Sequence, residues 1–108
     1  MSESKLDNII AIVNDGYSDY VMECAKDKGA RGGTIISANG SVSKDAGKLY
    51  GVDVHPGKEI ILILVKKELA PEILKVLYEK CGVQTPSCGI FFSLPVTHAS
   101  ENLINQYK

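Results

Sequence analysis

The sequence predicts an α+β protein with a ferredoxin-like β-α-β-β-α-β sandwich, in which two helices cover one face of a four-stranded antiparallel sheet. Three observations support this fold class. Four apolar, β-branched segments have the length of strands, and two segments with helical spacing of apolar residues lie between them. The 108 residues match the size of one domain, so we expect residues 1–108 to form a single domain.

The first half of the chain predicts a strand, a helix and a second strand. Residues 6–13 are apolar and β-branched, which indicates a buried strand that 14–16 interrupts. Ser18 is expected to cap a helix that runs to about Lys28. Gly29 is expected to end that helix as its C-terminal cap, and residues 33–39 then form the second strand.

The second half predicts the remaining strands and the second helix. Residues 59–66 form the clearest strand, and their continuous apolar character favours a central position in the sheet. Pro71 suits the first turn of a helix that Gly82 ends. Residues 89–96 predict the fourth strand, and the tail from residue 98 to 108 is expected to contain a short helix.

Between the second and third strands lies a long segment, 41–57, without a sustained hydrophobic period. It contains three glycines and one proline, which indicates a loop. Loops of this length are uncommon in compact domains and are often functional or disordered. We therefore expect 41–57 to be a mobile loop whose order depends on a ligand or partner.

Apolar side chains are expected on both faces of the central strand, whereas two helices cover only one face. Symmetric oligomers bury such surfaces against other copies of the same chain, so we expect a homo-oligomer. The net charge is −1, with 12 basic and 13 acidic residues, which disfavours nucleic acid as a partner. The longest apolar run, 60–65, is too short to span a bilayer, and the N-terminus has no apolar signal core; a cytoplasmic location is therefore expected.

The segment Gly29 to Gly40 resembles the second strand of the P-II (PII) signal-transduction family. Thr34 and Gly40 keep that family's spacing between a nucleotide-contacting threonine and the glycine that opens a mobile effector loop, and 41–57 occupies the place of this loop. Residues 61–69 are similar to the third strand and the entry to the second helix, and 87–96 to the phosphate-binding turn and final strand. The resemblance covers roughly residues 7–96 and implies a trimeric regulator.

The resemblance implies that a nucleotide binds in a cleft between subunits. Its ligand would be ATP, ADP, AMP or a cyclic dinucleotide, with no covalently bound cofactor and no metal. Lys58, Lys66 and Lys67 are candidates to supply positive charge to a phosphate or carboxylate. The full set of candidate binding residues is Thr34, Asn39, Gly40, Ser41, Leu64, Val65, Lys66, Ser87, Cys88 and Gly89.

Several family features are missing from this chain. Gly89 occupies the expected place of a phosphate-binding lysine, and no arginine follows Arg31. The tyrosine-arginine-glycine modification motif is absent, although Tyr50-Gly51 is similar to part of it. Affinity for triphosphates is therefore expected to be weak or shifted toward less charged ligands.

The expected function is regulation, without enzymatic activity, of a transporter or metabolic enzyme through the loop 41–57. The open alternatives are a metal or redox sensor and a small trimeric enzyme, both built on Cys88, His55 and His98. An RNA-binding module has the same element order, and Phe91-Phe92 could stack bases, but the neutral charge and few aromatic residues argue against it. The three cysteines are interpreted as reduced thiols.

Overall fold

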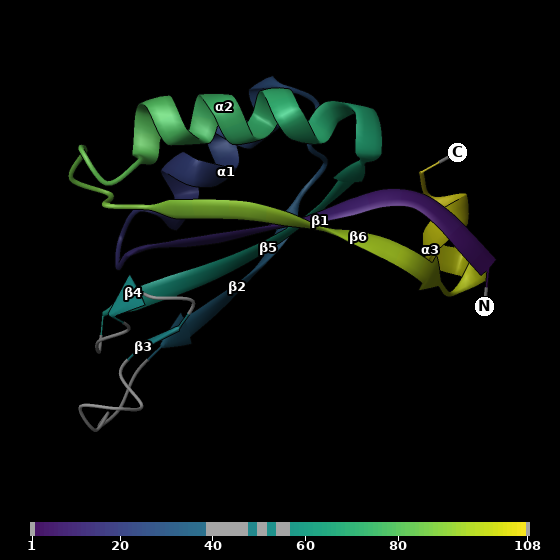
Figure 1. Ribbon diagram of the computed structural model, residues 1–108, viewed down its shortest axis with the longest axis horizontal. Helices are drawn as coiled ribbons and strands as arrows, with labels where there is room; N and C mark the ends of the chain where they lie inside the picture. Colours follow the sequence, from purple (N-terminus) through teal and green to yellow (C-terminus); the bar gives the residue numbers. More distant parts are fainter. Residues whose placement is uncertain (1, 39–47, 50–51, 54–56, 108) are drawn as a thin grey trace.

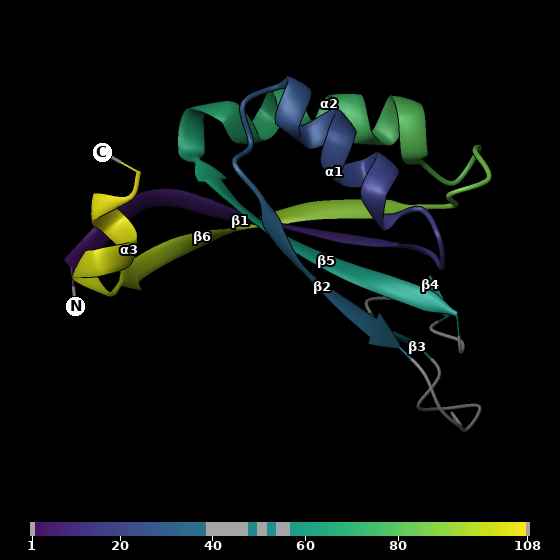
Figure 2. The same ribbon diagram turned by 180° about the vertical axis from the view of Figure 1, so that it is seen from behind.

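The fold is an antiparallel sheet of four strands with two helices packed on one face, as the sequence predicts (Figures 1 and 2). The computed structural model describes residues 2–38, 48–49, 52–53 and 57–107. The strand order in the sheet is β2-β5-β1-β6, so β5 and β1 are the central strands. The elements are β1 (Ser2–Asn14), α1 (Ser18–Asp27), β2 (Gly33–Ala38), β3 (Lys48–Leu49), β4 (Val52–Asp53), β5 (Lys58–Lys66), α2 (Ala70–Cys81), β6 (Ile90–Ala99) and α3 (Glu101–Asn105).

The core lies between the sheet and the two helices. Along β5, every second residue from Glu59 to Val65 is buried, which is the two-residue period of a strand with one face against a core. The apolar faces of α1 and α2 pack on these positions and on the matching positions of β1. The buried cluster consists of Ile9, Ala11, Val13, Val21, Cys24, Ala25, Ala30, Ile61, Ile63, Val65, Ala70, Ile73, Leu77 and Cys81.

The opposite face of the sheet carries a second set of apolar side chains. Cross-strand register places Thr34, Leu62, Ile10 and Phe92 in one row, and the adjacent row contains four isoleucines from the same four strands. Neither α1 nor α2 covers this side of the sheet (Figure 1). Ile36 and Leu94 on this face are 45% and 48% exposed. We call this surface the open face.

The ends of α1 differ in one respect from the sequence prediction. Ser18 was expected to be the N-terminal cap, but it is the first residue inside the helix and makes no cap hydrogen bond. Its buried hydroxyl instead donates to Oε2 of Glu59 at 3.3 Å, because the β5 carboxylate lies beside the start of α1. The same carboxylate accepts the Gly16 amide at 2.9 Å through Oε1.

The C-terminal end of α1 confirms the role predicted for Gly29. This residue has a φ of +108°, in the left-handed region that glycine adopts without strain. Its amide donates to Lys26, and the Ala30 amide donates to Ala25, each at 3.1 Å. These two bonds form a Schellman motif, which ends the helix and turns the chain toward β2.

The remaining differences concern element lengths. β1 runs from residue 2 to 14, longer than the predicted 6–13, and β6 continues to Ala99 because its second half pairs with that extension. Within the predicted loop 41–57, the described residues 48–49 and 52–53 form β3 and β4, a short antiparallel pair that the sequence reasoning did not anticipate. The mobility of this segment stays a prediction.

The tail prediction is confirmed by α3, which lies beside the N-terminal half of β1 at the end of the sheet away from β3 and β4 (Figure 1). Within the part of the chain that the structure describes, no helix is long and apolar enough to cross a membrane.

Candidate functional site

Six of the ten candidate residues fall into two groups at opposite ends of the sheet. The first group, Leu64, Val65 and Lys66, is the carboxyl end of β5. Val65 and Lys66 line a cavity of about 130 Å³ that we call the tail pocket. The tail pocket is lined by Gly29, Arg31, Val65, Lys66, Leu69 and Tyr107.

In the tail pocket, the C-terminal residues are held by two elements distant in sequence. The Tyr107 hydroxyl donates to the backbone carbonyl of Leu64 at 3.0 Å. The guanidinium carbon of Arg31 lies 4.8 Å from the centroid of the Tyr107 ring, within the range of a cation–π contact. Arg31 also donates through Nη1 to the backbone carbonyl of Gln106.

The position of Arg31 follows from the turn between α1 and β2. After the Schellman motif, Arg31 stands two residues before Gly33, the first residue of β2. A Cβ on Gly33 would lie 2.8 Å from the Leu62 carbonyl oxygen and 3.0 Å from the Met22 sulfur, so only glycine fits where β2 meets β5. This close approach fixes the path of the chain and so places Arg31 beside the end of β5.

The second group, Ser87, Cys88 and Gly89, lies in the turn between α2 and β6, which we call the 82–89 turn. The Cys88 amide donates to Thr85 at 2.9 Å, and the Gly89 amide donates to Cys81 at 2.7 Å. Cys88 has a φ of +47°, a left-handed conformation that few residues other than glycine adopt. Both amides are therefore engaged inside the turn and do not point to a common anion site in this conformation.

The 82–89 turn is anchored to the end of β1. The Asn14 amide donates to the Ser87 carbonyl at 2.9 Å, and the Asn14 side chain donates to Pro86 at 3.0 Å. Asn14 in turn pairs with Lys58, the first residue of β5. The turn therefore lies at the amino end of β5, on the side of the molecule opposite to the tail pocket.

The distance between the two groups decides whether one chain can hold one ligand with both. Eight residue steps separate Lys58 from Lys66, and a strand rises about 3.3 Å per residue, so the two ends of β5 are about 26 Å apart. Thr34 pairs with Leu62 on the open face, midway between the two ends of β5. A single chain therefore does not bring the two groups together. Asn39, Gly40 and Ser41 lie outside the described residues.

The candidate lysines are divided in the same way. Lys58 is at the amino end of β5 with the 82–89 turn, whereas Lys66 and Lys67 are at its carboxyl end. Each end of the sheet thus carries positive charge suited to an anionic ligand. Lys28, by contrast, forms an exposed ion pair with Glu72 at 3.5 Å.

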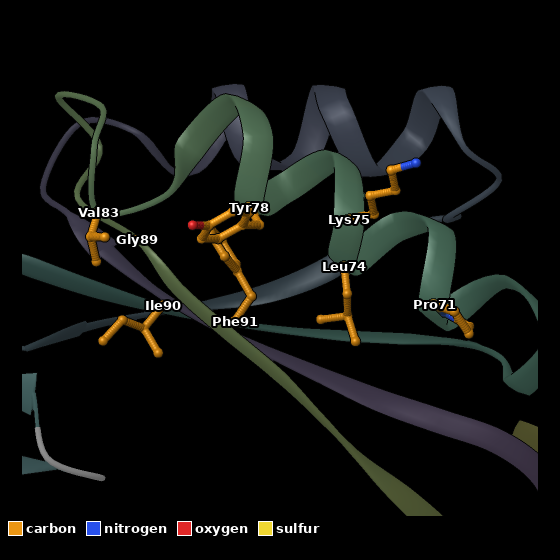
Figure 3. Close-up of a pocket in the computed structure, with 8 residues that line it drawn as sticks. All are labelled: Pro71, Leu74, Lys75, Tyr78, Val83, Gly89, Ile90 and Phe91. Carbon is orange, nitrogen blue, oxygen red and sulfur yellow. The ribbon is translucent and has the colours of Figure 1, made fainter.

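A further hollow lies between α2 and the start of β6 (Figure 3). Its volume is about 490 Å³, and Tyr78 and Phe91 form much of its apolar wall, with Lys75 at the rim. Of the candidate residues, it includes Gly89 alone. Its lining residues are Pro71, Leu74, Lys75, Tyr78, Val83, Gly89, Ile90 and Phe91. The spacing of apolar residues in α2 gives no signal for this groove, because it depends on where β6 begins.

The cysteines differ in their surroundings. Cys24 and Cys81 are buried between the helices, whereas Cys88 is half-buried. Burial, followed by the neighbouring Cys24, raises the pKa of the Cys81 thiol to about 11. Over the described residues, which exclude His55, no three histidine, cysteine or carboxylate side chains gather in a way that could hold a metal ion.

Two residues of the tail pocket were missed as site candidates. Arg31 is the sole arginine of the sequence, and its place directly before Gly32-Gly33 was the feature that could have marked it as a site residue. Tyr107 gave no signal, because its contact with Arg31 joins residues far apart in the chain. Sequence reasoning identified the strand that lines the pocket but not the two side chains that fill it.

Comparisons with known proteins give the fold. No protein-family model and no curated protein sequence match this chain. The structure of CPII from Thiomonas intermedia bound to ADP, AMP and acetate matches with a TM-score of 0.65 and 15% identity, over 96% of this chain and 98% of that one. Arabidopsis thaliana PII bound to citrate matches with a TM-score of 0.62 and 23% identity, over 88% and 78%. A PII-like signalling protein of Thermus thermophilus matches with a TM-score of 0.60 and 22% identity, over 87% of this chain and 88% of that one. This chain therefore has the PII-like fold, with a divergent sequence.

Proposed function

We propose that this chain, which has the fold of PII-like proteins, is a regulator that binds an adenine nucleotide in clefts between the subunits of a homotrimer. The observation that supports this most is the division of the candidate residues between the two ends of β5. Because about 26 Å separates the ends, a ligand that uses both groups must lie where two copies meet. That the CPII structure contains ADP and AMP supports an adenine nucleotide as the ligand.

The open face supports the trimer. A sheet with apolar side chains on both faces needs a second cover, and neighbouring copies provide it in closed symmetric assemblies. The two exposed residues Ile36 and Leu94 are on this face, at both edges of the sheet. Burial of apolar surface contributes roughly 25 cal/mol per Å², so these side chains favour association.

The proposed output is a change in the segment 41–57. A nucleotide alters this segment only if it binds one of its conformations more tightly than another. The partner would be a transporter or a metabolic enzyme that the segment engages or releases. The protein would act by binding alone, and nucleotides recovered after incubation should be chemically unchanged.

The experiment compares two isoleucines on neighbouring positions of β2. Ile36 points to the open face and Ile35 to the helix side, and both are more than 40% exposed. Ile36→Asp should dissociate the trimer, of about three times 11.7 kDa, and abolish AMP and ADP binding in calorimetry. Ile35→Asp is the matched control and should retain both.

The results separate the parts of the proposal. A wild-type protein that is monomeric at micromolar concentration by light scattering would reject the shared cleft. A trimer that binds none of ATP, ADP, AMP and the cyclic dinucleotides would reject the nucleotide. Thr34→Val, which removes one hydroxyl from the open face, should weaken binding without changing the oligomeric mass.

A further inference from the structure

The tail pocket holds a flat ring in a setting that suits a nucleobase. The ring of Tyr107 is next to the Arg31 guanidinium, 4.8 Å from its carbon, and its hydroxyl donates to the Leu64 carbonyl at 3.0 Å. Guanidinium groups stack on aromatic rings and on bases alike. A strand carbonyl that accepts a tyrosine hydroxyl can equally accept an exocyclic amino group.

Adenine combines these two features in one ligand. It is a planar ring, and its exocyclic amino group is a hydrogen-bond donor. Lys66 lines the same pocket and Lys67 follows it, so positive charge lies within reach of a phosphate attached to such a base. The contacts that hold Tyr107 are thus the contacts that an adenine nucleotide needs.

The geometry points to a base-binding subsite formed by Arg31 and the Leu64 carbonyl, which the chain's own Tyr107 occupies in the absence of ligand. Arg31 is the stacking surface, the Leu64 carbonyl selects a base with an amino donor, and the C-terminal segment competes with the nucleotide. This inference rests on the proposed function, and it adds how the base is recognised and how the tail regulates affinity.

The attachment of the tail is weak enough for such competition. α3 has five residues and contains no buried residue. Beyond the helix, the described contacts of the tail with this pocket are one hydroxyl bond, one stacking contact and one arginine bond. When a binding-competent state is only partly populated, the apparent affinity falls by that fraction. A tail that is docked about nine-tenths of the time would lower nucleotide affinity about ten-fold.

The test measures AMP affinity by calorimetry on the full chain and three variants. Tyr107→Ala should bind AMP about ten-fold more tightly than the wild type, because it removes the competing ring. Tyr107→Phe, which keeps the ring but loses the hydroxyl, should show a smaller gain. Tyr78→Ala is the matched control, since this tyrosine is 59% exposed on α2 and away from the tail pocket; its affinity should equal that of the wild type.

Arg31 is tested in the Tyr107→Ala background, where the tail no longer contributes through its ring. Adding Arg31→Ala there should weaken AMP binding at least five-fold, because the stacking surface is lost. If Arg31→Ala leaves the affinity of the Tyr107→Ala protein unchanged, Arg31 is not the stacking surface and the subsite is wrong.

The remaining outcomes separate this inference from the proposed function. If the wild type binds AMP but Tyr107→Ala binds it equally or less tightly, the competition is refuted and the nucleotide-binding function stands. If neither protein binds AMP or any other adenine nucleotide, both are refuted. Inosine monophosphate carries an oxygen in place of the amino group, so Tyr107→Ala should increase its affinity less than it increases the affinity for AMP. An equal increase would refute the hydrogen bond from the base to the Leu64 carbonyl.

Discussion

Gly89 is the position where this chain departs most clearly from the P-II pattern, and the structure predicts what a side chain there would do. A Cβ at this position would lie 2.4 Å from the Cys81 carbonyl oxygen and 2.5 Å from Cζ of Phe91. The first of these neighbours is backbone, which also accepts the Gly89 amide at 2.7 Å. Even alanine must therefore push α2 and β6 apart.

The size of the effect follows from these contacts. Separation weakens one backbone hydrogen bond, worth about 1 kcal/mol, and forces overpacking that costs about 1–3 kcal/mol. Gly89→Ala should therefore lower the free energy of unfolding by about 2–4 kcal/mol, the combined range of these two terms. A lysine at this position should cost at least as much, because its Cβ would meet the same neighbours.

The assay is urea unfolding at a fixed protein concentration, because association contributes to the apparent stability of an oligomer. Gly32→Ala is the control: a Cβ there has no neighbour within 4 Å, and such a change at a compatible position stabilises by about 0.4–1 kcal/mol. If Gly89→Ala is as stable as the wild type to within about 0.5 kcal/mol, the steric account of the turn is wrong.

Three further predictions concern stability, reactivity and the loop. Glu59→Ala should lower the free energy of unfolding by about 2 kcal/mol in the same assay, because its removal leaves the Gly16 amide and the Ser18 hydroxyl without their acceptor. A loss below about 0.5 kcal/mol would show that these two hydrogen bonds contribute little to stability. The pKa of Cys81 is raised to about 11, so alkylation of this thiol by iodoacetamide in the folded protein should be slow at pH 8 and become faster as the pH rises toward that value. At pH 8, mass spectrometry should find the half-buried Cys88 labelled first; equal labelling rates for Cys81 and Cys88 would contradict this. Deleting residues 43–54 should leave the trimer stable and remove partner engagement, and circular dichroism showing an unfolded body would mean that the segment is structural.

The sheet and its helices could be predicted because local patterns determine them. The apolar run of β5, the Gly29 cap and the length of α2 each depend on residues close in sequence, so local composition and turn chemistry located them. Ser18 was assigned to the wrong partner for the opposite reason. Its hydroxyl bonds to Glu59, 41 positions away, and no local rule indicates that a β5 carboxylate replaces the cap.

The candidate site was predictable by strand but not by side chain. The resemblance of 61–69 to the family identified the carboxyl end of β5, and the structure places the tail pocket there. Arg31 and Tyr107 meet only after the C-terminal segment folds back along the sheet, and such long-range contacts leave no periodic trace. The sequence also could not show that its candidate residues lie at opposite ends of the sheet, because the contacts that hold the 82–89 turn at the amino end of β5 are made by Asn14, far away in the chain.

The central claim is that two copies of this chain share each nucleotide site, and mixed trimers test it most directly. Lys66→Glu disables the group at the carboxyl end of β5, and Lys58→Glu disables the group at its amino end, beside the 82–89 turn. A trimer made of only one of these variants should not bind AMP. Unfolded together in equal amounts and refolded, they should form mixed trimers in which one of the three sites has two intact halves. Because three-quarters of random trimers are mixed, the mixture should bind AMP with about one quarter of the wild-type capacity and unchanged affinity. A mixture that forms mixed trimers but binds no AMP would show that each site belongs to a single chain and would contradict the account.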